Sequence, residues 1–181
     1  MNTPDPSMEI ALKQYLDCGT TLESAVEGLR EVDLDQRADE GWSIRQMVHH
    51  IADGDDIWKN CILLILGKPD TEFDLSWYWS IPQENWADFW GYSSRDIHGS
   101  LARFRANREM IVDLLRIRPE TWRSSAIIHW PRDSQASRIS IEDVVEMQTR
   151  HPRGHCSEIL NIRQVYGLAQ SSYRDRPTLR E

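Results

Sequence analysis

The sequence has no long hydrophobic run and few cysteines. Its longest apolar stretch, Cys61–Leu66, is much shorter than the roughly 20 residues of a membrane-spanning helix. Residues 1–7 carry neither positive charge nor an apolar stretch, so we expect no secretion signal. The three cysteines, Cys18, Cys61 and Cys156, are odd in number and far apart, which favours reduced thiols over a disulfide framework. These absences predict a cytoplasmic protein without a membrane partner.

Positive charge is also scarce. The chain has 21 Lys and Arg residues against 29 Asp and Glu residues, which gives a formal net charge of −8, and its basic residues are scattered. Proteins that bind nucleic acid usually carry a basic patch, so we expect no nucleic acid partner. Hydrophobic residues make up 40% of the chain, enough for a core. The length predicts a single domain over residues 1–181 with frayed ends at 1–6 and 174–181.

Four amphipathic helices are predicted from apolar residues that recur every three or four positions. The expected ranges are 7–32, 43–66, 93–117 and 140–166. Ser43, Ser93 and Ser140 are each followed three residues later by Gln or Asp, a pattern typical of helix starts. Long rods of this kind bury their apolar faces most simply as an all-α four-helix bundle.

The connections between these helices differ in length. The second and third helices are joined by residues 67–92, a crossover connection long enough to cross the length of the bundle. In the connection to the last helix, residues between Trp122 and Trp130 alternate in polarity, so a short β-hairpin is possible there. The crossover holds four of the eight tryptophans, between Trp77 and Trp90. We expect these rings to pack on the bundle, with a pocket wall or a homodimer surface as alternatives.

Three histidines fall on the apolar faces of two helices. His151 and His155 are four residues apart in the last helix, so their rings share one face, and His50 lies on the inward face of the second helix. Each could be a hydrogen-bonded core histidine, or the three could share a metal ion; the spacing alone leaves both interpretations open. Pro152 lies between the pair and should kink the helix between Gln148 and Pro152.

Two segments carry a resemblance to a known family. GWSIRQMVHHIADGD at residues 41–55 and HPRGHCSEILNIRQVYG at residues 151–167 are similar to the histidine motifs of the DinB/YfiT-like helical metalloproteins. The resemblance implies a four-helix bundle in which His50, His151 and His155 bind one divalent ion, zinc or alternatively nickel. It also implies metal-dependent chemistry, since some relatives are S-transferases or isomerases that use a low-molecular-weight thiol and others are described as hydrolases.

The sequence therefore predicts a divalent-metal-dependent enzyme that acts on a small-molecule substrate, either a thiol S-transferase with a thiol cosubstrate or a hydrolase. A cation on three histidines can activate a bound water or thiol. Asp53, one turn after His50, is a possible proton acceptor, or else an exposed acidic residue. Glu158 could hold the outer nitrogen of a ligand, and Arg108 on an inward face needs an anion, from the substrate or from Asp55. The alternative function is a non-enzymatic helical protein that binds a metal or a small ligand.

Overall fold

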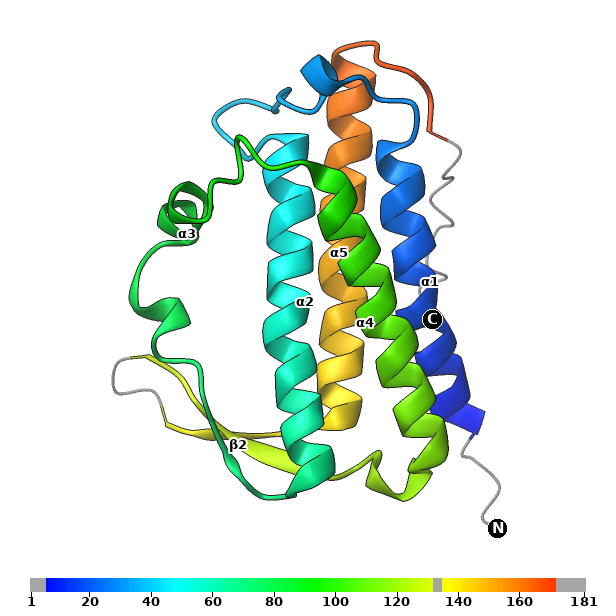
Figure 1. Ribbon diagram of the computed structural model, residues 1–181, viewed down its shortest axis with the longest axis vertical. Coiled ribbons are helices and arrows are strands. Elements are labelled where there is room, and N and C mark those ends of the chain that lie inside the picture. The colour runs from blue at the N-terminus through cyan, green and yellow to red at the C-terminus, as the bar shows by residue number, and fades with distance from the viewer. Residues whose placement is uncertain (1–5, 132–134, 172–181) are drawn as a thin grey trace.

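The computed structural model describes residues 6–131 and 135–171. Its main body is a bundle of four long helices, with a small sheet at one end (Figure 1). The four long helices are α1 (Pro6–Val26), α2 (Ile44–Gly67), α4 (Ile97–Ile117) and α5 (Ile141–Val165). A seven-residue helix, α3 (Gln83–Phe89), and three short 3-10 helices, Glu31–Asp33, Tyr78–Ser80 and Pro119–Thr121, lie in the connections.

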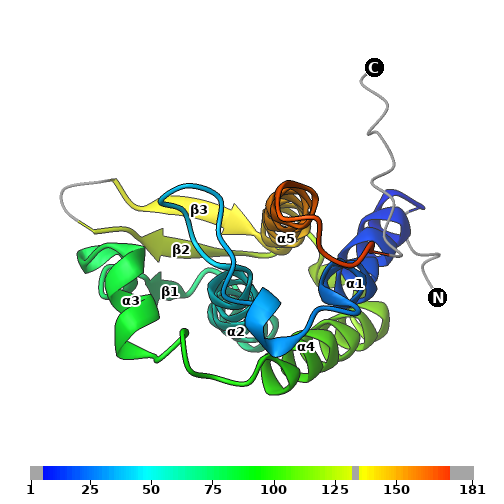
Figure 2. The same cartoon turned by 90° about the horizontal axis from the view of Figure 1, so that it is seen from above.

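The order of the helices around the bundle places α2 beside α5. Seen from above, α1, α5, α2 and α4 follow one another around the axis, so that α1 is diagonal to α2 and α4 is diagonal to α5 (Figure 2). The colour gradient in Figure 1 shows that α2 and α4 run in one direction and α1 and α5 in the other. The second and last helices, which carry the three histidines, are therefore antiparallel neighbours.

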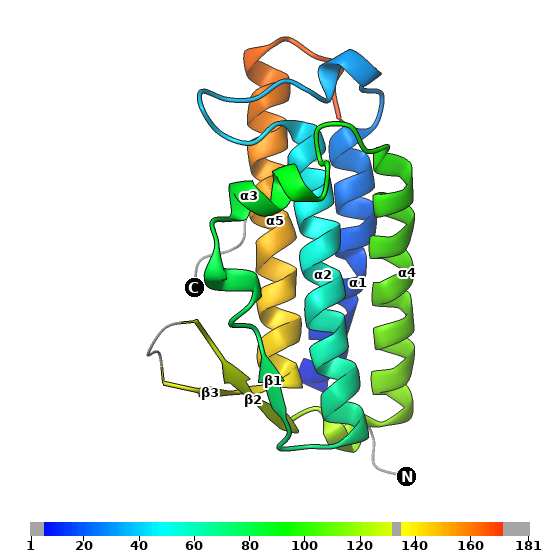
Figure 3. The ribbon, with the colours of Figure 1, turned by 60° about the vertical axis from the view of Figure 1, so that its left-hand side comes forward.

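The small sheet has three strands, β1 (Glu72–Asp74), β2 (Ser125–His129) and β3 (Ser137–Ser140). Strand β2 is central and pairs antiparallel with β3, with Ser125 opposite Ser140, which confirms the expected hairpin strands. The parallel pairing of β1 with β2 was not predicted, because it joins two different connections of the bundle. Figure 3 shows the sheet beside the end of the bundle where α5 begins.

The core consists of two apolar clusters. The first apolar cluster surrounds Leu12, Ile62 and Leu115, and the second surrounds Leu22 and Phe104. Burying a leucine or isoleucine side chain completely contributes about 1.5–3 kcal/mol, so the inward faces account for most of the stabilisation. Polar side chains lie between the two clusters along three helices, and these are Asp55 on α2, Arg108 on α4, and Gln148 and His151 on α5. We call this set the polar layer.

Two helix ends differ from the predicted ranges. Helix α1 ends at Val26 and not at Val32, because Gly28 takes a positive φ of 72° that closes the helix with a turn. Helix α4 begins at Ile97, where the Asp96 side chain accepts a hydrogen bond from the amide of His98 at 3.0 Å, so Ser93 does not cap it.

The expected frayed ends stay a prediction. Pro6 is the first residue of α1. Residues 1–5 and 174–181 lie outside the described residues. Within the described ranges, no helix has both the length and the apolar character needed to cross a bilayer.

The capping residues make a first testable prediction. Substituting Ser140→Ala or Asp96→Ala removes a side chain that bonds the first turn of a helix, and each change should lower the free energy of unfolding by about 1 kcal/mol. Ser93→Ala is the matched control and should change it by less than about 0.5 kcal/mol, as an exposed position outside a cap. Urea denaturation measures all three. A loss at Ser93 as large as at Asp96 would contradict the assigned helix start.

Candidate metal centre

The structure brings His50, His151 and His155 together between α2 and α5. One nitrogen from each ring lies within 4.8 Å of the other two. Nε2 of His50 is 3.0 Å from Nε2 of His151. The ring centroids are 4.9–5.1 Å apart and the ring planes meet at 80–89°, so the three rings surround one point from three directions.

Local sequence explains this convergence. The spacing of four residues puts His151 and His155 on one face of α5, one turn apart. His50 reaches them from α2 because the two helices are neighbours. Gly54, one turn after His50, faces the opposite ring, since a Cβ atom there would lie at ordinary van der Waals distance, 3.9 Å, from Cε1 of His151.

Burial keeps the imidazoles of His50 and His151 neutral. The pKa of His50 falls to about 3, mainly through loss of hydration and then through the neighbouring His151 and His155. The pKa of His151 falls to about 4, again mainly through burial and then through His155 and Arg108. At neutral pH both rings therefore present free lone pairs, which is the form in which histidine binds metal ions.

The donor set fits a divalent ion of the zinc or nickel type. A tetrahedral zinc ion with Zn–N bonds of about 2.0–2.1 Å separates two ligand nitrogens by about 3.3 Å, close to the distance between His50 and His151. Nδ1 of His155 lies 3.3 Å from Oε2 of Glu158, so its other nitrogen is left for the shared point. The Glu158 contact agrees with the predicted role, because a carboxylate on the outer nitrogen fixes the orientation of a ligand ring.

Sequence reasoning missed Trp42 as part of this site. Its ring lies edge-on to His50 with centroids 4.5 Å apart, and it also contacts Tyr92 at 6.4 Å. Together with Glu158 and Asn161, it lines a cavity of about 350 Å³, and none of the three histidines is among the lining residues of this cavity. Its position directly before the helix cap Ser43 is the signal that could have indicated this contact.

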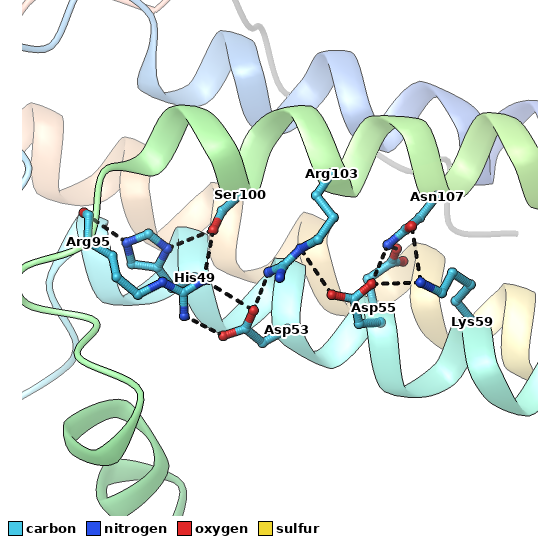
Figure 4. A network of polar contacts seen from close by, with 9 residues as sticks. His49, Asp53, Asp55, Lys59, Arg95, Ser100, Arg103 and Asn107 are labelled. Atoms are coloured by element: carbon cyan, nitrogen blue, oxygen red, sulfur yellow. Dashed lines mark hydrogen bonds and ion pairs between the residues drawn. The ribbon is translucent and has the colours of Figure 1, made fainter.

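Asp53 points to a different neighbour. It lies on α2 and faces the start of α4, where Arg95, just before this helix, donates to it at 2.8 Å and Arg103 on α4 also pairs with it (Figure 4). Burial alone would raise the pKa of Asp53, but hydrogen bonds and positive charge from the two arginines outweigh this effect and lower it. Asp53 is not among the side chains that converge with His50, and its role as a proton acceptor stays a prediction.

Other candidate residues have structural partners. His49 is fully buried, and its two ring nitrogens contact Oγ of Ser100 at 2.8 Å and the carbonyl of Arg95 at 3.1 Å (Figure 4), so it points away from His50 as expected. Arg108 forms an ion pair with Asp55 at 2.9 Å, which selects the protein's own carboxylate from the two alternatives.

The aromatic connection packs largely on itself. Tyr78 is buried and stacks with Trp86 and Trp90, at centroid distances of 5.9 and 6.2 Å. Trp77, at 46% exposure, and Phe89, at 69%, remain accessible on its outer side. A homodimer through this surface stays a prediction.

The buried histidines predict how the metal-free protein responds to acid. Between about pH 6.5 and pH 4 the unfolded chain binds protons on histidines, while His50 and His151 in the folded chain do not. The free energy of unfolding should therefore fall as the pH is lowered, by about 1.4 kcal/mol per pH unit for each such histidine. Denaturation of chelator-treated protein at several pH values measures this slope.

Matched variants separate the contribution of His50 to this pH dependence from the contribution of the carboxylates. His50→Gln should have a shallower slope than the wild type, and His98→Gln, at an exposed position, should have the wild-type slope. Equal slopes for all three proteins would show that His50 takes up a proton freely in the folded state.

Comparisons with known proteins identify a family and similar folds. The family model of the DinB superfamily matches residues 14–159, which include all three histidines. Among solved structures, YfiT from Bacillus subtilis has a TM-score of 0.78 at 20% identity, covers 93% of each chain, and is described as a probable metal-dependent hydrolase with an unusual four-helix bundle topology.

A second solved structure is more distant. The mycothiol-dependent maleylpyruvate isomerase has a TM-score of 0.55 at 13% identity, and the match covers 84% of this chain and 60% of that one. No match was found among curated proteins. The fold, the histidine geometry and the extent of the family match lead to one conclusion: this chain belongs to the DinB superfamily.

Proposed function

We propose that this chain is a divalent-metal-dependent enzyme that acts on a small molecule, with His50, His151 and His155 as the metal ligands. The observation that carries the proposal is the convergence of three imidazoles, one of each ring's nitrogens within 4.8 Å of the others, in a partly buried site. Zinc is the first choice of ion and nickel the alternative. When bound, such an ion supplies a Lewis acid that lowers the pKa of a water or thiol ligand.

The surrounding residues hold the ligands and shape the site. Glu158 contacts the outer nitrogen of His155 and so orients this ring, and the indole of Trp42 restricts the ring of His50 from its side. These two residues also line a cavity of about 350 Å³ that none of the three histidines lines. This volume lies at the low end of the range for ligand pockets, about 300–1,000 Å³.

Two reaction classes have separate support. Hydrolysis is favoured by the similarity to YfiT, which extends over nearly the full length of both chains and whose description names a probable metal-dependent hydrolase. Transfer or isomerisation with a low-molecular-weight thiol is favoured by the weaker similarity to an isomerase that depends on mycothiol. Non-enzymatic binding of a metal or small ligand is the remaining alternative.

Metal analysis tests the ligand assignment. Protein purified without chelators should contain about one divalent ion per chain by plasma mass spectrometry, and His155→Ala should lose it, because two imidazoles hold a divalent ion much more weakly than three. His98→Ala removes an exposed histidine from outside the cluster and should retain the ion. Full metal content in His155→Ala would show that His155 is not a ligand.

Activity assays separate the reaction classes. The metal-loaded protein should hydrolyse an activated ester such as p-nitrophenyl acetate, or else conjugate monobromobimane with glutathione, bacillithiol or mycothiol. The rate should fall to background in His155→Ala and remain in His98→Ala. A protein that binds its ion but shows no difference from His155→Ala in either assay would favour the non-enzymatic alternative.

A further inference from the structure

A proline inside α5 leaves one carbonyl without its helical donor. Pro152 has no N–H, so the carbonyl of Gln148, four residues earlier, cannot receive the usual helical hydrogen bond. Helix α5 nevertheless continues without a break from Ile141 to Val165. The missing donor is replaced from another helix, because Nη2 of Arg108 on α4 donates to this carbonyl at 2.7 Å.

Arg108 makes further contacts with the other two helices. Its Nη1 donates to the carbonyl of Tyr15 on α1 at 2.8 Å, and its Nη2 lies 2.9 Å from Oδ1 of Asp55 on α2. The guanidinium also lies over the rings of Tyr15 and Phe104, at 4.0 and 4.2 Å from their centroids. Both Arg108 and Asp55 are fully buried. One side chain on α4 thus connects all three of the other long helices.

These contacts lie close to the histidines along the chain. Gln148 is three residues before His151, and Asp55 directly follows Gly54, the residue that faces the His151 ring. The planar fork of an arginine can hold these acceptors in fixed directions, which the ammonium of a lysine cannot. A buried ion pair often adds little net stability compared with apolar side chains of similar size. The property that distinguishes the Arg108–Asp55 pair from apolar side chains is therefore its effect on the positions of the helices.

We propose that Arg108 is a positioning residue for the metal centre, which holds α5 in register against α2 by donating to the carbonyl that Pro152 leaves free. The inference rests on the proposed function, since it concerns metal binding by His50 and His151. Arg108 is not one of the three converging side chains. It acts on the position of the ligand helices through Gln148 and Asp55.

The test couples Arg108 to Pro152. Arg108→Lys keeps the charge beside Asp55 but loses the fork, and should weaken Zn²⁺ binding by about 10-fold, as losses of supporting contacts around metal ligands do. Pro152→Ala restores the amide that can bond to the carbonyl of Gln148, so Arg108→Lys combined with Pro152→Ala should regain most of the affinity. Competition with a chromophoric chelator measures affinity, and the absorption spectrum of the Co²⁺ form reports ligand geometry.

A matched control separates position from stability. Leu115→Ala, on the same helix and fully buried in the first apolar cluster, should cost about 2–5 kcal/mol of unfolding free energy yet leave Zn²⁺ affinity unchanged. If Arg108→Lys does not fold, Arg108→Met with Asp55→Asn removes both charges together, and the same loss and the same recovery by Pro152→Ala are expected.

The outcomes distinguish this inference from the proposed function. Wild-type affinity in the folded Arg108 variants, or a loss that Pro152→Ala does not reduce, overturns the positioning role while leaving the metal site intact. Wild-type protein that binds Zn²⁺ no better than His155→Ala overturns the metal site, and the positioning role with it.

Discussion

The contact between α2 and α5 is the constraint on which the site depends. It places Nε2 of His50 3.0 Å from Nε2 of His151, and no other pair of elements could bring these residues together across about a hundred positions of sequence. The diagonal arrangement of the bundle produces this contact, since α1 and α2 are consecutive in the sequence but are not neighbours around the axis. Because α1 and α2 are diagonal, residues 27–43, which include Trp42, cross the end of the bundle to connect them.

Histidines at this position are costly for a helical core without a ligand. Their pKa values fall because burial disfavours the charged form, and their nitrogens lose the hydrogen bonds that water would offer. Nδ1 of His151 is buried and has no hydrogen-bond partner within the described parts of the chain. A bound divalent ion would offset this cost, so metal binding and stability of the bundle are expected to be linked.

The polar layer gives the interior a different organisation from that of a uniformly apolar bundle. Arg108, Asp55 and Gln148 lie between the two apolar clusters. Arg108 pairs with the carboxylate of Asp55 and donates to the backbone carbonyls of Tyr15 and Gln148, whereas Nε of Arg108 and Oε1 of Gln148 have no hydrogen-bond partner among the described residues. Pro152 belongs to this arrangement because it has no N–H. The carbonyl of Gln148 is therefore free to accept a hydrogen bond from Arg108. The expected cost of a proline inside a helix, about 3 kcal/mol, is thereby reduced through a contact with another helix.

The sequence by itself determined the features that depend on short-range interactions. The starts of α2 and α5 follow from Ser43 and Ser140, and the inward faces follow from the spacing of apolar residues, because capping bonds and helical periodicity involve neighbours within one turn. The error at the start of α4 arose because Ser93 and Asp96 could each have capped a helix, and the error at the end of α1 arose because Gly28 ends the helix before Val32.

Only the tertiary structure decided which of these faces meet. It placed Trp42 against His50, paired Arg108 with Asp55, turned Asp53 towards Arg95, and joined β1 to β2. Each of these contacts joins two separate elements. Their formation depends on how four apolar faces pack together at once, and no local pattern in the sequence records that choice.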